Sequence, residues 1–198
     1  MSAEKERKPN ENGIARLGLI LFTVTFITAL LLGLTNALTK DRIAFARKQQ
    51  ALDAMKLVQA SADEFAPVEA EYANDMVKAV YEAKKGGEII GYCVEAGPRG
   101  FSDTVQIMVG ISSENAVTGV SVISISDTPG LGAKAADQLF LNQFAGKSGP
   151  LTVTKGAATG DNDILALTGA TITSKGVTSG VQAALDCVSK LRTEGIIK

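Results

Sequence analysis

Two threonines separated by small residues form the segment Thr168-Gly169-Ala170-Thr171 in the C-terminal part of the chain. Apolar residues then recur at helical spacing, so this segment lies just before the expected start of a helix. The free N–H groups and the positive dipole end of a helix start favour an anion, and Lys175 adds a positive charge. The small neighbours leave the Thr171 hydroxyl accessible. The segment therefore indicates either a phosphate site or an ordinary Ser/Thr-rich helix cap.

Hydrophobic patterning defines the elements around this segment. The apolar run from Ile164 to Leu167 is bounded by polar residues and predicts a strand or an extended entry. The helix that follows carries its apolar residues on one face, and Thr173 or Ser174 can cap it. The apolar positions are Val177, Val181, Ala184, Leu185, Val188 and Leu191.

A second loop, Asp127-Thr128-Pro129-Gly130-Leu131-Gly132, lies between an expected strand at residues 117–126 and an expected short helix at residues 133–144. One proline and two glycines favour a tight loop whose backbone comes close to a ligand. The alternative is that Asp127 only begins the turn. This loop and the threonine segment are the two places where the sequence predicts chemistry.

The composition excludes several kinds of site. The chain has no histidine, which excludes imidazole bases, histidine-ligated haem and most zinc sites. Cys93 and Cys187 form no Cys-x-x-Cys motif, so iron–sulfur and thioredoxin-type chemistry are excluded. The two thiols either pair outside the cytoplasm or are buried separately. The net charge of -1 and the lack of a basic face argue against a nucleic-acid partner. Redox chemistry in this chain would therefore require an organic cofactor.

Residues 17–39 carry no charge and are dominated by Leu, Ile, Val and Phe. As a helix they would reach roughly 33 Å, which is enough to cross the hydrocarbon core of a bilayer. A signal peptide is the alternative, but its apolar region would be only about 7–15 residues long. We therefore expect a retained single-span anchor, preceded by a polar tail at residues 1–16. Basic residues flank both ends of the span, so the positive-inside rule does not decide its orientation.

The remaining residues predict an α+β fold. Residues 40–66 predict a stalk whose helix runs to about Ala62 and packs on the domain, with a membrane-surface helix as the alternative, and Pro67 breaks the helical pattern. Strands are expected at residues 77–83, 88–94, 105–111 and 117–126, and the short turns between them imply antiparallel pairing. We therefore expect residues 67–198 to form an antiparallel sheet with flanking helices on one side, tethered by one N-terminal transmembrane helix.

The motifs, taken in this order, resemble those of FMN-binding subunits of membrane redox complexes. The sequence is most similar to the G subunits of Rnf electron-transport complexes, which are related to the C subunits of sodium-translocating NADH:quinone reductases. The resemblance covers nearly the whole chain. It is carried by the anchor, Gly91-Tyr92, Val109-Gly110-Ile111, and the two loop motifs that begin at Asp127 and Thr168.

The resemblance implies covalent FMN, carried on Thr171 through a phosphoester bond, with Thr168, Gly169 and Ala170 completing the attachment motif. It also implies that the loop from Asp127, and especially Thr128 and Leu131, lies against the flavin. Tyr92 and Phe101 are weaker candidates for contact and are expected to pack in the core. Because the family attaches FMN outside the cytoplasm with a flavin transferase, residues from about 40 onward are expected to be extracytoplasmic and residues 1–16 cytoplasmic.

The implied function is electron relay by a subunit that has no complete active site of its own. By resemblance, it would belong to an inner-membrane pump that exchanges electrons between ferredoxin and NAD and moves Na+ or H+. Its partners would be the other membrane and peripheral subunits. Two alternatives are an FMN-bearing domain of a separate extracytoplasmic reductase or regulator, and a membrane-tethered binding module without flavin.

Two positions depart from the family pattern. Leu165 stands three residues before Thr168, where the family often has an acidic residue that the flavin transferase recognises. The first loop of the family usually has Glu preceded by His two residues earlier, and here Asp127 and Ile125 occupy those places. The change to Asp127 keeps the negative charge.

Overall fold

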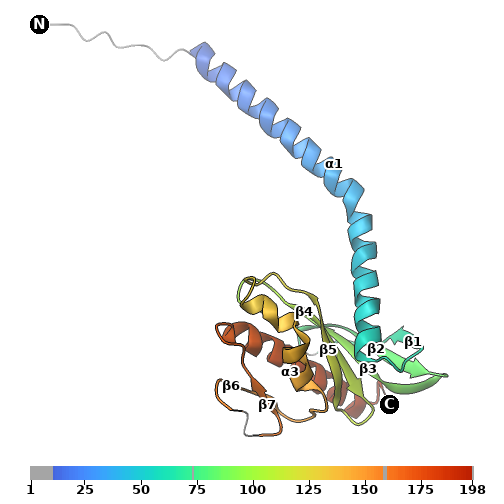
Figure 1. The fold of residues 1–198 in the computed structure, drawn as a ribbon. Coiled ribbons are helices and arrows are strands. Elements are labelled where there is room, and N and C mark those ends of the chain that lie inside the picture. Colours follow the sequence, from blue (N-terminus) through green and yellow to red (C-terminus); the bar gives the residue numbers. More distant parts are fainter. Residues whose placement is uncertain (1–10, 73, 158–159, 198) are drawn as a thin grey trace, which may run out of the picture. The chain divides into compact units, whose positions relative to one another are not determined.

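The computed structural model describes residues 11–72, 74–157 and 160–197. The chain divides into two compact units, residues 1–48 and residues 49–198, and each is considered by itself (Figure 1). Helix α1 (Glu11–Val58) begins in the first unit and ends in the second. Of the expected polar tail, residues 1–10 lie outside the described residues. Residues 11–16 form the first turns of α1, because the helix continues without a break from the apolar stretch.

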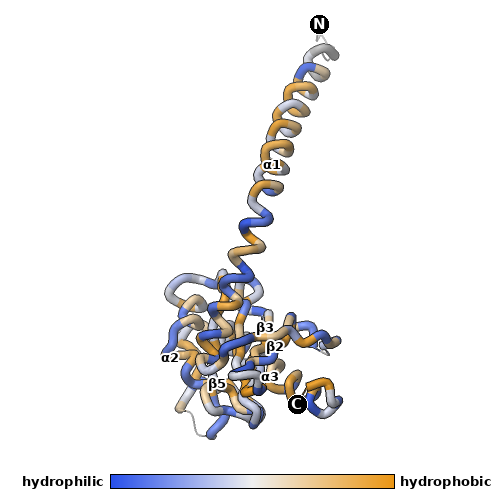
Figure 2. The backbone as a smooth tube through the Cα atoms, turned by 90° about the vertical axis from the view of Figure 1, so that its right-hand side faces the viewer, coloured by the Kyte–Doolittle hydropathy of each residue, from blue (hydrophilic) through white to orange (hydrophobic). Residues whose placement is uncertain are grey.

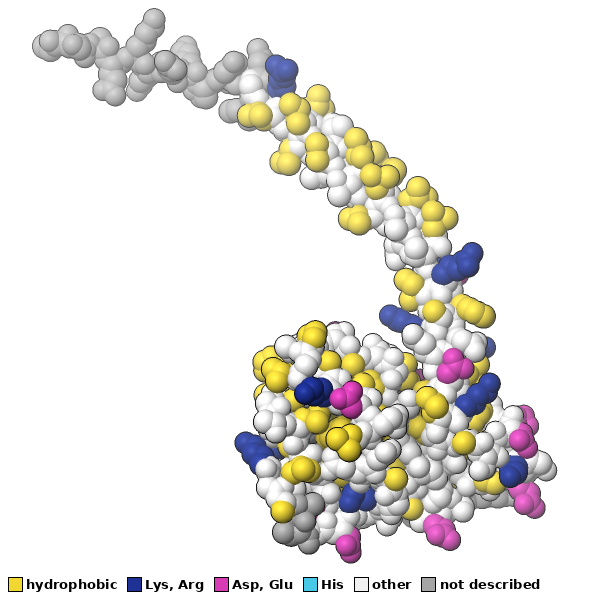
Figure 3. All heavy atoms as spheres, in the orientation of Figure 1, with side chains coloured by type: hydrophobic (Ala, Val, Ile, Leu, Met, Phe, Trp, Pro, Cys, Tyr) yellow, Lys and Arg dark blue, Asp and Glu magenta, His cyan; other side chains and the backbone are white. Residues whose placement is uncertain are grey.

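The part of α1 in the first unit has the length and composition of a membrane span. Its large apolar side chains are exposed. Figure 2 shows the hydrophobic residues along this part of the helix, and Figure 3 shows apolar side chains on the face in view. The hydroxyls of Thr23, Thr28 and Thr39 each donate a hydrogen bond of 2.8 Å to the carbonyl four residues earlier. These side chains are therefore satisfied within the helix, as a segment in hydrocarbon requires.

The second unit is built on a five-stranded antiparallel sheet with the order β1-β2-β3-β4-β5. The strands are β1 (Glu64–Pro67), β2 (Val77–Lys85), β3 (Glu88–Ala96), β4 (Gln106–Ser112) and β5 (Val117–Ser124). Gly86 and Gly87 both have positive φ and close the β2–β3 hairpin, where a two-residue turn of this kind matches the strand twist. The expected α+β class with an antiparallel sheet is therefore confirmed.

Helix α3 (Thr171–Thr193) covers one face of this sheet (Figure 1). Its predicted apolar face is buried against the inward side chains of the central strands. The contacts include Val94, Ile107 and Val109, all fully buried. Strand periodicity and helix periodicity thus meet in one main core, as a two-layer domain requires.

The last turns of α1 cover the opposite face of the sheet, so the expectation of helices on one side only is wrong. Ala54, Met55 and Val58 pack against the buried side chains of Cys93 and Met108. The reason is the composition of β3 and β4, whose second face is also apolar and must be removed from water. Residues 49–58 therefore belong to the folded domain, together with β1.

Glycines in the sheet allow the end of α1 to approach this closely. A Cβ on Gly110 would lie 2.6 Å from the Val58 carbonyl oxygen, which is closer than real contacts allow. The same carbonyl accepts a hydrogen bond of 2.7 Å from the Thr118 hydroxyl. The Gln59 side-chain amide donates to the Ile111 carbonyl at 3.1 Å. The junction is therefore close-packed and hydrogen-bonded.

Other expectations are corrected in detail. The stalk helix ends at Val58 rather than near Ala62, and Pro67 closes β1, an edge strand where it costs no ladder bond. The expected helix at residues 133–144 is instead a series of short helices: η1 (Gly132–Ala136), α2 (Gln138–Leu141) and η2 (Asn142–Phe144). The extended entry to the threonine segment is β7 (Asp163–Leu165), which pairs in parallel with β6 (Thr152–Thr154).

Cys93 and Cys187 are both buried and unpaired. They belong to different cores, because Cys93 packs with α1 and Cys187 packs in the α3 core. Of the two alternatives left by the sequence, separate burial is the one observed.

Candidate cofactor site

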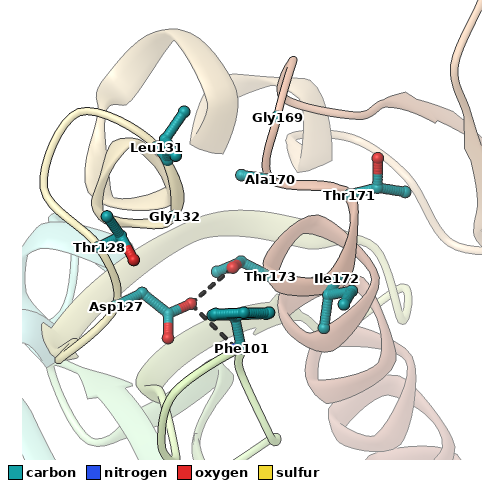
Figure 4. Close-up of a pocket in the computed structure, with 10 residues that line it drawn as sticks. All are labelled: Phe101, Asp127, Thr128, Leu131, Gly132, Gly169, Ala170, Thr171, Ile172 and Thr173. Carbon is teal, nitrogen blue, oxygen red and sulfur yellow. Dashed lines mark hydrogen bonds between the residues drawn. The ribbon is translucent and has the colours of Figure 1, made fainter.

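The two loop motifs, some 40 residues apart in the sequence, line one pocket. The pocket has a volume of about 340 Å³, within the range of small-molecule sites. Figure 4 shows the loop after β5 on one side and the start of α3 on the other. Its lining consists of Phe101, Asp127, Thr128, Leu131, Gly132, Gly169, Ala170, Thr171, Ile172 and Thr173.

Helix α3 begins at Thr171 itself, one turn earlier than the expected caps would place it. Ala170 is the N-cap residue, and no described side chain caps the first turn. The predicted cap at Thr173 or Ser174 is therefore wrong. The Ser174 hydroxyl instead accepts from the Leu167 N–H and donates to the Ala170 carbonyl, both at 3.0 Å. Thr171 is half-buried in the wall of the pocket, and the first N–H groups of the helix have no intrahelical partners there.

The turn that precedes α3 depends on Gly169. Its φ of 76° is in the left-handed region, and a Cβ would lie 3.0 Å from the Leu131 side chain of the opposite loop. A larger residue would therefore be strained and would press the two motifs apart.

The loop after β5 is closed by its own backbone. The Thr128 carbonyl accepts hydrogen bonds from the N–H groups of Leu131 at 3.1 Å and Ala133 at 3.2 Å. Gly130 takes the positive φ that this turn needs. Thr128 and Leu131 remain exposed at the pocket, so their side chains are available to a ligand.

Asp127 is buried and joins three segments of the chain. Its Oδ2 accepts a hydrogen bond of 2.5 Å from the Thr173 hydroxyl and one of 3.1 Å from the Phe101 N–H. Its Oδ1 accepts one of 2.7 Å from the Ser102 N–H. Burial raises the pKa of Asp127, but the bonds from Thr173 and from the backbone of residues 101–103 outweigh burial and leave the pKa below its usual value. The carboxylate is therefore ionised at neutral pH and engaged by the protein.

The structure brings most of the predicted site residues together, but not all of them. Thr168 and Lys175 are exposed and do not line the pocket. Sequence reasoning missed Ile172, which directly follows Thr171, and included Gly132 only as the last residue of the first loop motif. For Phe101 it favoured core packing over the weaker alternative of ligand contact, whereas the side chain is 62% exposed and lines the pocket. Its position within a Gly-rich loop was the available signal. Tyr92 is fully buried in the core, as expected.

Leu165, at the position where relatives often have an acid, is held in β7 by the side chain of Gln143. The Leu165 N–H donates to that side chain at 2.8 Å, and the Leu165 carbonyl accepts from it at 3.3 Å. Among the described residues, no group of three His, Cys, Asp or Glu side chains is placed to hold a metal ion.

Comparison with known families matches two parts of the chain. Residues 100–186, which include every lining residue of the pocket, match the FMN-binding domain. Residues 2–58 match the RnfG N-terminal region. The chain is 38% identical over 193 residues to the G subunit of the Na(+)-translocating ferredoxin:NAD(+) oxidoreductase complex of Acetobacterium woodii, covering 90% of this chain and 93% of that protein.

The chain belongs to the G-subunit family of ion-translocating oxidoreductase complexes. A second relative, the G subunit of the proton-translocating ferredoxin:NAD(+) oxidoreductase complex of Clostridium ljungdahlii, is 33% identical over 91% of this chain and 94% of that protein. The crystal structure of the C subunit of Na(+)-translocating NADH-quinone reductase from Parabacteroides distasonis aligns with a TM-score of 0.55 at 19% identity. The alignment covers 76% of this chain and 94% of that chain, which shows a shared fold.

The residues of the pocket fit FMN, the ligand of the domain family that residues 100–186 match. Apolar side chains on both walls suit a flat aromatic ring, and the uncapped start of α3 suits a phosphate. Thr171 lies between these two environments, at the first helical position.

Proposed function

We propose that this chain carries FMN as a phosphoester on Thr171 and relays electrons inside a membrane complex that couples redox chemistry to Na+ or H+ transport. The names of the relatives, which are ferredoxin:NAD(+) oxidoreductase subunits, support ferredoxin and NAD as the substrates of the whole complex. Those substrates would bind other subunits. A flavin transferase would attach the FMN during maturation.

The position of Thr171 is the observation that carries this proposal. Its side chain lies in the pocket wall at the N-terminus of a 23-residue helix whose first turn has no side-chain cap among the described residues. A phosphodiester at this point would place a negative charge at the positive end of the helix dipole. Such a charge is stabilised by about 0.3–1 kcal/mol at an exposed helix start.

The other pocket residues would bind and orient the ring of the cofactor. Bound FMN supplies the electron-transfer chemistry that the side chains of this chain lack. The Thr128 hydroxyl is exposed at the pocket and can hydrogen-bond to a polar edge of the ring. Leu131 and Ile172 offer aliphatic surface on opposite walls and exclude water from it.

The decisive test is the substitution Thr171→Ala in the full chain, produced together with its own membrane system. We expect it to abolish in-gel flavin fluorescence while the protein still accumulates in the membrane. Thr193→Ala is the matched control, because Thr193 is exposed at the other end of α3 and lies outside the pocket. Peptide mass mapping should find the added mass of FMN on the peptide that contains Thr171. Fluorescence that persists in Thr171→Ala would refute the assignment.

We also propose that the second unit lies outside the cytoplasm. Support comes from the apolar part of α1, which has the length and composition of a membrane span, and from extracytoplasmic flavin attachment in the family that the chain resembles. Protease added to intact spheroplasts should digest this unit while a cytoplasmic control protein survives. Protection of the unit, when a known external protein is digested, would reverse the orientation.

The relay role distinguishes this chain from a free-standing reductase. A flavinylated variant that begins at Gln49 should accept electrons from a strong chemical reductant but should not turn over NADH or quinone. In that variant, Thr128→Val should shift the flavin potential without loss of the cofactor. Sustained NADH oxidation would favour the separate reductase. If the protein purified from its own membrane carried no FMN, a binding module would be favoured.

A further inference from the structure

Phe101 is a large apolar side chain whose exposure the fold does not explain. It is 62% exposed, on the loop between β3 and β4, at residues 97–105. Figure 4 shows it in the pocket below Thr173 and next to Ile172. It is the one aromatic side chain among the described residues that line this pocket.

The loop that carries Phe101 is held firmly by its own hydrogen bonds. The Val105 N–H donates to the Pro98 carbonyl at 2.9 Å, and the Gly100 N–H donates to the Asp103 carbonyl at 2.8 Å. Arg99 and Thr104 form an isolated antiparallel bridge between these bonds. The loop is therefore a small closed hairpin and not an open surface segment.

Two glycines of α3 let this hairpin pack directly on the helix. A Cβ on Gly180 would lie 2.6 Å from the Pro98 ring, and a Cβ on Gly176 would collide with the Arg99 carbonyl oxygen. Both glycines are in helical positions, where glycine costs about 1 kcal/mol relative to alanine. Both glycines lie on the face of the helix that contacts the hairpin. The close contacts at these two positions fix the distance between the hairpin and the helix that carries Thr171.

Asp127 fixes the backbone of Phe101 itself. Its carboxylate accepts the N–H groups of Phe101 and Ser102 and, on the other side, the hydroxyl of Thr173. A Cβ on Gly100 or Gly132 would lie 2.9 or 2.8 Å from the same carboxylate oxygen, so the group is closely surrounded. The Asp127 carboxylate therefore holds the hairpin, the loop after β5 and the first turn of α3 in one arrangement.

We infer that Phe101 is a cofactor-binding residue that packs its ring on the flat ring system of FMN, and that Asp127 is a positioning residue that holds it there; this inference rests on the proposed function. A rigidly mounted, exposed aromatic ring is pre-organised for contact with a planar ligand, because little conformational freedom is lost on binding. Burial of such a side chain stabilises the bound state, since apolar surface leaves water. Asp127 is 5% exposed at the pocket, and its carboxylate is engaged by the hydrogen bonds from Phe101, Ser102 and Thr173, so it acts through these groups.

The test uses an electron-rich aromatic ring as a contact probe, because an indole in van der Waals contact with a flavin quenches flavin fluorescence. The full chain is loaded with FMN in its own membrane and carries Phe101→Trp. Leu139→Trp is the matched control: Leu139 is 89% exposed on α2 and does not line the pocket. We expect a flavin fluorescence lifetime severalfold shorter in Phe101→Trp than in wild type, and an unchanged lifetime in Leu139→Trp. Phe101→Tyr serves as a second probe where the larger indole prevents loading.

The positioning role is tested in the Phe101→Trp background by adding Thr173→Val, which removes one of the bonds to Asp127. We expect the single short lifetime to become a broad distribution, while Thr173→Ser restores it. Mass spectrometry of each sample reports FMN on Thr171 independently of the lifetime. FMN on Thr171 with equal lifetimes in Phe101→Trp, Phe101→Tyr and Leu139→Trp would overturn this inference and leave the proposed function intact. Absence of FMN from the wild-type protein would overturn both.

Discussion

The hydrogen bond from Thr173 to Asp127 makes the sharpest prediction about stability. Thr173→Val keeps the shape of the side chain closely and replaces the hydroxyl with a methyl group. The Thr173 side chain is 1% exposed, so water cannot replace the lost donor at Asp127. A hydrogen bond to a charged group contributes about 1.5–3 kcal/mol to stability. Removing the donor leaves the buried Asp127 oxygen with one bond fewer, and this destabilises the folded state. We therefore expect Thr173→Val to lower the free energy of unfolding by about 2 kcal/mol.

Thr178→Val provides the matched control on the same helix. Thr178 is 3% exposed, and its hydroxyl donates at 2.8 Å to the Ser174 carbonyl, a neutral group. A neutral hydrogen bond contributes about 0.5–1.5 kcal/mol, so this substitution should cost clearly less. The comparison matches burial and the change of residue type, so the difference reports the charge on the acceptor.

The pH dependence gives a second check on the same bond. The pKa of Asp127 is lowered in the folded protein from its ordinary value of 3.8, so its contribution is fully present above that pH. The contribution is lost as the pH falls through the lower folded-state pKa. The difference between wild type and Thr173→Val should therefore be constant near neutral pH and shrink below pH 3.8, while the difference for Thr178→Val should not change.

The assay is urea unfolding of the flavin-free second unit, begun at Gln49, followed by circular dichroism at several pH values. This unit has its own core and includes the last turns of α1. A Thr173→Val loss no larger than that of Thr178→Val at pH 7 would refute the reasoning. A pH-independent difference would show that the Asp127 charge is not involved.

Three further predictions follow from the packing of the second unit. Removal of residues 49–59 in addition to residues 1–48 should strongly destabilise the unit in the same urea assay, because it exposes the face of the sheet around Met108. Equal stability of the two truncated proteins would contradict this. Gly110→Ala should also destabilise the unit, by about 1–3 kcal/mol through overpacking against Val58. Gly156→Ala, with open space around it, should have almost no effect. Burial raises the pKa of the Cys93 thiol to about 12, so iodoacetamide at pH 8 should alkylate Cys93 in the folded unit more slowly than the less buried Cys187, as followed by mass spectrometry.

The sequence by itself determined the local elements and the two motifs. The uncharged run at residues 17–39 required a long apolar helix, and apolar runs bounded by turn residues placed the strands of the central hairpins within a few residues of their ends. The spacing of Val177, Val181 and Val188 defined the buried face of α3 correctly. Each of these depends on neighbours within one turn or one hairpin, and such interactions are readable from a single chain segment.

Only the tertiary structure decided which distant groups meet. From the sequence, Asp127 could begin a turn or bind a ligand. The structure shows that its two oxygens accept hydrogen bonds from Thr173 and from the Phe101 hairpin. The expected cap at Thr173 failed for the same reason, since its hydroxyl is used by a carboxylate 46 residues away instead of by its own helix. Core packing was favoured for Phe101 because its apolar side chain does not by itself indicate whether it faces the core or a pocket. Its place in the pocket is fixed by hydrogen bonds and glycine contacts between three segments, and no local pattern in the sequence encodes contacts of that kind.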